Sequence, residues 1–221
     1  MTRIQGTVVS SILAVSFTFV FIGKMPHHVN GMSPYYSSFR AIESKVFERA
    51  EMERQRTAEK LRDQARSKIR KVLLEYKTGL AEEFELQMPE LILQESAKYG
   101  YDPLFLTALI ITESSFYNRA KSHRGALGLM QIRPATGKAI AKEAQIEWKG
   151  TPTLFDPGMN IAIGAYYLNK LLDRFGDLSL ALEAYNHGPS QLSRYLRKGF
   201  RPKKYSQQVN KHYKLIQSLS I

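Results

Sequence analysis

The sequence predicts an all-α protein in which a helical domain, residues 86–221, follows a charged helical segment and an N-terminal apolar segment. From residue 86 onward, short apolar stretches are interrupted by proline and glycine, and an alternating strand pattern is nearly absent. Between Ala58 and Leu80, within the charged segment 39–85, apolar side chains recur mostly every three or four positions, which is typical of an amphipathic helix. These patterns favour helices throughout.

The composition indicates one globular domain with an accessory segment. A chain of 221 residues can hold one well-cored domain but is short for two large ones. With 43% hydrophobic and 24% charged residues, wholesale disorder is excluded. Cysteine is absent, so the chain has no disulfide framework, thiolate metal site or lipoprotein attachment site. The five histidines lack the spacing of metal ligands, and no metal or organic cofactor is implied.

The net charge of the chain points to a polyanionic partner. The formal charge is +12 and the sequence pI is about 9.8. Nucleic acid, anionic lipid and a carboxylate-rich cell-wall polymer all satisfy such a charge. The zinc-finger, RNP and basic-zipper patterns are missing, so no nucleic-acid partner is expected. Strongly salt-dependent binding to DNA or RNA would be the sign of that alternative.

Residues 1–24 predict a signal peptide or a membrane anchor. An apolar run at residues 8–23 lies between Arg3 and Lys24. The run is slightly shorter than the roughly 20 residues of a membrane span, yet no clear cleavage site follows it, so both interpretations stay open. A buried core helix is the weaker alternative, because the run lacks an amphipathic face. Residues 25–38 are rich in proline, glycine and serine and predict a linker.

Residues 39–85 predict a long charged helix. Its apolar stripe consists of Ala58, Leu61, Ala65, Ile69, Val72, Leu73, Tyr76 and Leu80. The stripe is too rich in alanine, and too irregular before Ala58, to specify a coiled coil. Two interpretations remain equal: a spacer or self-association segment that holds the domain away from a membrane, and a helix packed on the domain.

Helix boundary signals recur through residues 86–221. Asp102 before Pro103, and Asp156 before Pro157, each place a capping carboxylate ahead of a proline suited to the first helical position. Gly176 lies where a helix C-cap is expected, and so does Gly199. We therefore expect short helices that begin and end at these residues.

The helix that Pro103 opens ends on a carboxylate. Residues 104–111 are apolar on nearly every side, which predicts a buried helix, and Glu113 lies in its last turn. Burial disfavours the ionised form of a carboxyl group, so we expect the pKa of Glu113 to be raised, as suits a general acid. The alternative is a glutamate harmlessly exposed at a helix end.

Three strips of sequence accompany Glu113. They are Glu113-Ser114-Ser115-Phe116, Gly125-Ala126-Leu127-Gly128-Leu129-Met130-Gln131 and Ala184-Tyr185-Asn186. In this order and at these separations, residues 91–209 resemble the catalytic domain of the soluble-type lytic transglycosylases, which is related in fold to goose-type lysozyme. The resemblance implies a lysozyme-like helical domain and a peptidoglycan substrate. It also implies a location in the cell envelope, either periplasmic or anchored in the inner membrane facing the periplasm.

The strips have physical uses in a sugar-binding groove. Gly125 and Gly128 permit close approach of a sugar to the main chain. Gln131 and Asn186 carry amides able to bind hydroxyl or acetamido groups, and Tyr185 offers a ring and a hydroxyl. Taken alone, the glycines would be a turn, Met130 a core-filling residue and Tyr185 an ordinary helix-face aromatic. The residues that the resemblance assigns to substrate binding are Ser122, Gly128, Leu129, Met130, Gln131, Tyr185, Asn186 and Tyr205.

The mechanism that the resemblance implies uses one carboxylate. Glu113 would protonate the glycosidic oxygen between N-acetylmuramic acid and N-acetylglucosamine, then accept the proton of the muramoyl 6-hydroxyl, leaving a 1,6-anhydromuramoyl end. The substrate's N-acetyl carbonyl would stabilise the reacting centre, with Ser122 orienting that group. An ordinary glycosidase needs a second carboxylate. The candidates are Asp156, better explained as a helix cap, and Glu183, which stands where the family usually has a small apolar residue.

The sequence departs from the family pattern in its late motif. The family has a Glu-Thr pair ahead of a tyrosine, whereas Arg201-Pro202-Lys203-Lys204 precede Tyr205 here. His187 replaces an alanine, and Arg133 replaces a methionine found in many relatives. The alternatives to a transglycosylase are a goose-type hydrolase and a non-catalytic peptidoglycan-binding or secretion-apparatus scaffold, although the presence of Glu113 argues against a scaffold.

Overall fold

The computed structural model describes residues 34–220, which form helices joined by turns. Extended structure in this part of the chain is limited to isolated bridges of Leu127 with Lys121 and Ile132, so the predicted all-α class is confirmed. The chain divides into two compact units, up to Glu51 and from Met52 onward, and each is described by itself. The helices are α1 (Pro34–Leu74), α2 (Glu82–Tyr99), α3 (Pro103–Ser114), α4 (Pro134–Glu143), the short 3-10 helix η1 (Thr151–Phe155), α5 (Pro157–Phe175), α6 (Leu178–His187), α7 (Pro189–Arg197) and α8 (Lys204–Gln217).

The first unit contributes one stretch of helix within the described residues. Residues 34–51 are helical, so α1 begins inside the range that the sequence predicts as a linker. The side chains of Ile42, Val46 and Phe47 are more than 60% exposed. The apolar segment 1–24 and most of the linker lie outside the described residues. No helix of the described residues is long and apolar enough to span a membrane.

The second unit includes the end of α1. Ala65, Ile69, Val72 and Leu73 are buried there in the common core, as expected for a helix packed on the domain. The helix ends at Leu74, earlier than the apolar periodicity suggests. The physical reason is tertiary: the carbonyl of Thr78 accepts a hydrogen bond from the backbone N–H of Asn118 at 2.8 Å, which draws the chain out of helical geometry.

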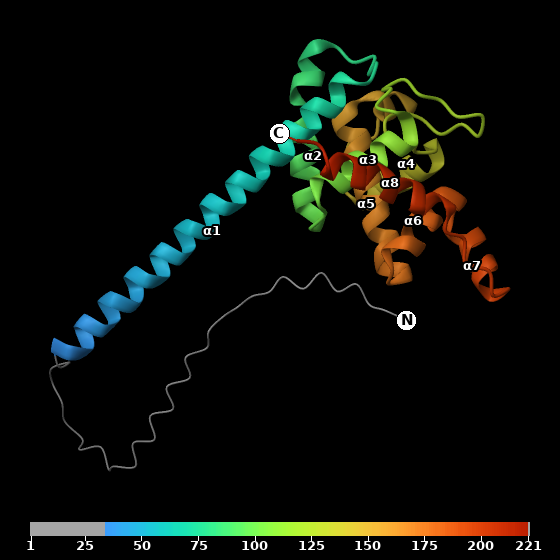
Figure 1. The fold of residues 1–221 in the computed structure, drawn as a ribbon. Helices are drawn as coiled ribbons and strands as arrows, with labels where there is room; N and C mark the ends of the chain where they lie inside the picture. The colour runs from blue at the N-terminus through green and yellow to red at the C-terminus, as the bar shows by residue number, and fades with distance from the viewer. Residues whose placement is uncertain (1–33, 221) are drawn as a thin grey trace. The chain divides into compact units, whose positions relative to one another are not determined.

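In the second unit, whose helices are shown in Figure 1, the apolar residues of α3 belong to the common core. Every residue from Leu104 to Ile111 is buried, which explains why this helix is apolar on all sides. It packs mainly against α8 and also against α2, while α5 packs against α2, α4 and α6. The Asp102 carboxylate accepts a hydrogen bond from the Leu104 N–H at 2.8 Å and Gly176 ends α5 in a left-handed conformation, as predicted.

Candidate active site

Glu113 lies in the last turn of α3, at the edge of the core. The chain turns sharply after it, because Ser115 and Phe116 both adopt left-handed backbone conformations, with φ of 51° and 59°. Such conformations cost a non-glycine residue energy. The fully buried ring of Phe116 packs on Tyr76, with ring centroids 5.9 Å apart, and this packing offsets the cost. The turn therefore gives Glu113 a fixed position.

The residue Glu113 is half-buried, and its carboxylate has one described hydrogen-bond partner. The hydroxyl of Tyr205, in the first turn of α8, donates to its Oε1 atom. Burial raises the pKa of Glu113 from its ordinary value of 4.5 to about 7, while the hydrogen bond from Tyr205 opposes that rise. At neutral pH a substantial fraction of Glu113 therefore carries a proton, as a general acid requires.

Two tyrosines on different helices interact electrostatically with Glu113. Burial and then the charge of Glu113 raise the pKa of Tyr185 well above its ordinary value, and the same two causes act on Tyr205. The hydroxyl of Tyr185 donates to the carbonyl of Met130 at 2.8 Å, and its ring lies 5.3 Å from that of Tyr167. The structure thus brings together Glu113, Tyr185 and Tyr205, although the late motif differs from the family pattern.

The glycine-rich strip forms a tightly held loop beside α5. Gly128 has a φ of +77°, and a methyl group there would collide with the backbone oxygen of Leu154 and the amide of Asn160. The side chains of Leu129 and Met130 are fully buried. Their side chains are therefore not available to a substrate, and binding through their backbone atoms stays a prediction.

Asn160 organises this loop, a role that sequence reasoning missed. Its side chain is fully buried; Oδ1 accepts a hydrogen bond from the Met130 N–H at 2.7 Å, and Nδ2 donates to the carbonyls of Leu127 and Leu154 at 3.1 and 2.8 Å. A lone asparagine among the apolar residues of α5 is the sequence signal, because a buried amide needs partners for its donors and acceptor.

The other predicted binding residues lie on the same loop or at the end of α6. Gln131 has a left-handed φ of 48°, and its side-chain amide donates to the carbonyls of Gly128 and Ala120, at 2.8 and 3.3 Å. The hydroxyl of Ser122 accepts from the Ala126 N–H at 3.0 Å. The side chain of Asn186 is exposed. These polar groups are available to a ligand only in part, because Gln131 and Ser122 also stabilise the loop.

The two other carboxylates considered in the sequence, Asp156 and Glu183, both accept hydrogen bonds from backbone N–H groups. Asp156 caps α5 by accepting a hydrogen bond from the Met159 N–H at 2.8 Å, as predicted. Glu183 is completely buried in α6 and accepts a hydrogen bond from the Ser206 N–H at 2.8 Å. Each of the two carboxylates thus accepts a backbone hydrogen bond within the fold. No cluster of three or more histidine or acidic side chains among residues 34–220 could hold a metal ion.

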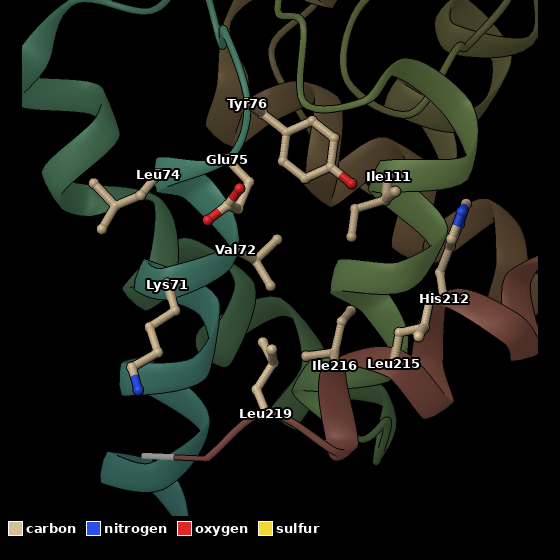
Figure 2. A pocket seen from close by; sticks show the side chains of 10 residues that line it. All are labelled: Lys71, Val72, Leu74, Glu75, Tyr76, Ile111, His212, Leu215, Ile216 and Leu219. Carbon is tan, nitrogen blue, oxygen red and sulfur yellow. The ribbon is translucent and has the colours of Figure 1, made fainter.

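An apolar pocket of about 370 Å³ lies on another face of α3. Figure 2 shows Ile111 of α3, Val72 of α1 and Ile216 of α8 around this space. The remaining lining residues are Lys71, Leu74, Glu75, Tyr76, His212, Leu215 and Leu219. Nδ1 of His212 lies 2.9 Å from the hydroxyl of Thr112, which ties α8 to the last turn of α3. Neither Glu113 nor Tyr205 lines the pocket, so it is not part of the candidate site.

Comparisons with known proteins show the family to which the chain is similar. Residues 90–208 match the family model described as "Transglycosylase SLT domain". A transglycosylase of Enterobacteria phage PRD1 is 38% identical over 131 residues, covering 59% of this chain and 44% of the phage protein. The membrane-bound lytic murein transglycosylase C of Cronobacter sakazakii is 45% identical over 85 residues, covering 37% of this chain and 23% of its own length.

A solved structure is also similar. The lytic transglycosylase Slt of Pseudomonas aeruginosa, crystallised as an inactive mutant, has a TM-score of 0.47 and 28% identity over 61% of this chain and 23% of its own length. This chain thus spans less than half of the length of each of these relatives.

Proposed function

Because the chain belongs to the transglycosylase SLT domain family, we propose that it is a peptidoglycan lytic transglycosylase. It would cleave the β-1,4 bond between N-acetylmuramic acid and N-acetylglucosamine and leave 1,6-anhydromuramoyl ends. The family match, the phage transglycosylase and the lytic murein transglycosylase support the activity. The observation that carries the proposal is a single carboxyl group, Glu113, with a pKa raised to about 7 at the end of a buried helix.

The chemistry follows from that carboxyl group. Protonated Glu113 donates its proton to the glycosidic oxygen as the bond to C1 of N-acetylmuramic acid breaks, and N-acetylglucosamine leaves with that proton. The resulting carboxylate accepts the proton of the muramoyl 6-hydroxyl as its oxygen bonds to C1. Glu113 ends protonated and ready for another cycle, and no water is consumed.

The fate of the other carboxylates supports a reaction run by one group. A conventional glycosidase places two carboxyl groups about 5–10 Å apart on either side of the bond. Asp156 is occupied as a helix cap, and the atoms of Glu183 are enclosed by protein. In the proposed reaction the substrate's own N-acetyl carbonyl stabilises the positive charge that develops at C1, and Ser122 orients that group.

The surroundings of Glu113 support a saccharide-binding role. Tyr185 lies within electrostatic range of the acid, and Gln131 and Asn186 retain amide atoms for sugar hydroxyls. Gly128, Leu129 and Met130 contribute backbone to the wall of the groove. Tyr205 supplies the hydroxyl that faces Glu113.

The proposed substrate places the protein in the cell envelope. The name of one relative, membrane-bound lytic murein transglycosylase C, is consistent with that location. Residues 1–24 would direct export or anchor the chain in the inner membrane. Within residues 39–85, the part that is not packed in the core would act as a spacer capable of self-association. The exposed apolar side chains of Ile42, Val46 and Phe47 in α1 support the last role.

Product analysis tests the proposed function. Purified peptidoglycan is digested with the full chain, and the ends of the released fragments are identified by mass spectrometry. Anhydromuramoyl ends are expected. Reducing muramic acid ends would instead make the protein a hydrolase, and undegraded polymer that remains bound to the protein would make it a scaffold.

A further inference from the structure

Glu183 lies at the centre of α6 with no exposed surface, and the proposed reaction gives it no role. Burying a carboxylate is costly unless specific partners compensate for the lost water. An isolated burial of this kind therefore calls for a structural or functional reason. The partners of Glu183 identify that reason.

The main partner is the first turn of α8. Oε1 of Glu183 accepts a hydrogen bond from the Ser206 N–H at 2.8 Å. The α8 helix receives no side-chain cap from its own N-cap residue, Lys203. Glu183 thus supplies, from another helix, an acceptor and a negative charge at a helix N-terminus, where unpaired N–H groups and the helix dipole favour both.

A second contact from α6 secures the same turn. The hydroxyl of Ser179 donates to the hydroxyl of Ser206 at 2.9 Å, and that hydroxyl in turn donates to the carbonyl of Lys203 at 3.0 Å. Ser206 is therefore held through its backbone by Glu183 and through its side chain by Ser179. We call Glu183, Ser179 and Ser206 the α6–α8 clamp.

The clamp lies one residue from the candidate site. Tyr205 directly precedes Ser206, and its hydroxyl donates to Glu113. The charge of Glu183 is also among the causes that raise the pKa of Tyr205, which places the two side chains within electrostatic range. A small rotation of the first turn of α8 would withdraw the hydroxyl from Glu113.

We infer that Glu183 is a positioning residue, which holds the first turn of α8 so that the hydroxyl of Tyr205 meets the carboxyl group of Glu113. The part of this inference that concerns kcat and KM rests on the proposed function, whereas the part that concerns the titration of Glu113 does not. The other oxygen of Glu183, Oε2, lies 3.4 Å from Nε2 of His187, at the end of α6. The imidazole of His187 packs edge-on against the ring of Tyr195, with centroids 5.5 Å apart, which limits its movement.

The test compares two substitutions at Glu183 in the full chain. Glu183→Ala removes the acceptor, whereas Glu183→Gln keeps an oxygen that can accept from the Ser206 N–H. The titration of Glu113 is followed by NMR with ¹³C-labelled glutamate, and kcat and KM are measured from anhydromuramoyl ends. In Glu183→Ala we expect the pKa of Glu113 to rise and kcat to fall about tenfold or more, with a smaller change in KM. Glu183→Gln should restore both.

Three further variants separate positioning from general damage. Glu95→Ala truncates another buried glutamate, in α2, and should leave the titration of Glu113 unchanged. Tyr205→Phe combined with Glu183→Ala should be no worse than Tyr205→Phe alone, because both act through one hydrogen bond. Ser179→Ala loosens the same turn more mildly and should shift the titration of Glu113 in the same direction, so it decides the matter if Glu183→Ala does not fold.

The inference is overturned if folded Glu183→Ala leaves the titration of Glu113 in place, if Glu183→Gln shifts that titration as much as Glu183→Ala does, or if the losses with Tyr205→Phe are additive. Failure of the proposed function gives a different result. The unsubstituted protein would then form no anhydromuramoyl ends, while the titration of Glu113 would still report on the clamp.

Discussion

The last turn of α3 and the middle of α6 each hold a glutamate, but the two carboxylates are held in opposite ways. Glu113 is partly exposed and, among the described residues, has the hydroxyl of Tyr205 as its hydrogen-bond partner. Glu183 is fully enclosed, accepts a backbone hydrogen bond from Ser206 and lies beside the imidazole of His187. A group that exchanges protons needs access and few partners, whereas a group that holds structure needs fixed donors.

This comparison shows that burial alone does not identify a catalytic acid. If burial decided, Glu183 would be the stronger candidate, because none of its surface is exposed. Partial exposure at the end of a helix selects Glu113 instead. The two residues are nevertheless connected through the first turn of α8, so each is expected to affect the other's measurable properties.

The largest effect is expected from Glu113→Gln. An amide can neither donate the proton to the glycosidic oxygen nor accept one from the 6-hydroxyl, so the rate of anhydromuramoyl formation should fall by about 10²–10⁴-fold. The rate is measured by mass spectrometry of digested peptidoglycan, and circular dichroism verifies that the variant is folded. Full activity in Glu113→Gln would remove this residue from the catalytic role.

Tyr205→Phe is expected to reduce activity less and to change its pH dependence. A hydrogen bond to a charged group contributes about 1.5–3 kcal/mol, so its loss should cost about tenfold or more in rate. The hydroxyl holds the pKa of Glu113 down, and its removal lets that pKa rise further above about 7. Because the acid must be protonated to react, the falling limb of the profile of kcat/KM against pH should move to higher pH.

A matched control for Tyr205→Phe lies on the same helix. The hydroxyl of Tyr213 donates to the carboxylate of Asp102, at the other end of α3 from Glu113. Tyr213→Phe should leave the falling limb of the pH profile in place. A limb that stays still in Tyr205→Phe, or that moves to lower pH, would show that Tyr205 does not control the proton of Glu113.

The sequence predicts the surroundings of Glu113 far better than those of Glu183. The apolar residues of α3, its capping Asp102 and the carboxylate at its end are local patterns, and they predict both the burial of Glu113 and the direction of its pKa shift. Asp156 was likewise predicted as a cap, because a cap depends on residues two or three positions away.

The contacts of Glu183 could not be predicted from the sequence. Its hydrogen-bond donor is the backbone N–H of Ser206, a residue 23 positions away. Sequence patterns of helices describe neighbours on one element and carry no information on such a pairing. The same reason explains the early end of α1, which depends on a hydrogen bond between Thr78 and Asn118, and the amide of Gln131, which stabilises its own loop.

Substitution of the two glutamates should affect the free energy of unfolding in different ways. The pKa of Glu113 is raised on folding, from 4.5 to about 7, so the folded state binds its proton more tightly than the unfolded state. This contribution to stability is complete below about pH 4.5 and is lost as the pH rises towards 7, by up to roughly 3 kcal/mol. Glu113→Gln does not titrate, so its stability relative to the unsubstituted protein should increase across that window.

Urea denaturation at several pH values measures this difference in the free energy of unfolding. Glu183→Ala is the counterpart, because it leaves the buried Ser206 N–H without its acceptor and should lower stability by about 1–3 kcal/mol. A difference between Glu113→Gln and the unsubstituted protein that does not vary between pH 4.5 and 7 would show that burial does not raise the pKa of Glu113.

The smallest effect is expected from Asp156→Ala. This variant tests whether Asp156 takes part in catalysis, as proposed for Glu113, or stabilises the fold, as proposed for Glu183. Its side chain accepts a hydrogen bond from the Met159 N–H, so its loss should cost about 1 kcal/mol of stability, the usual value for a helix cap. Asp156→Asn, which can cap the helix as well, should regain most of that loss. Because the carboxylate takes no part in the proposed reaction, the anhydromuramoyl product and the pH profile of kcat/KM should be those of the unsubstituted protein in both variants. A changed profile in the capped Asp156→Asn variant would give Glu113 a second acidic partner, and the reaction would then have to be described as that of a two-carboxylate glycosidase.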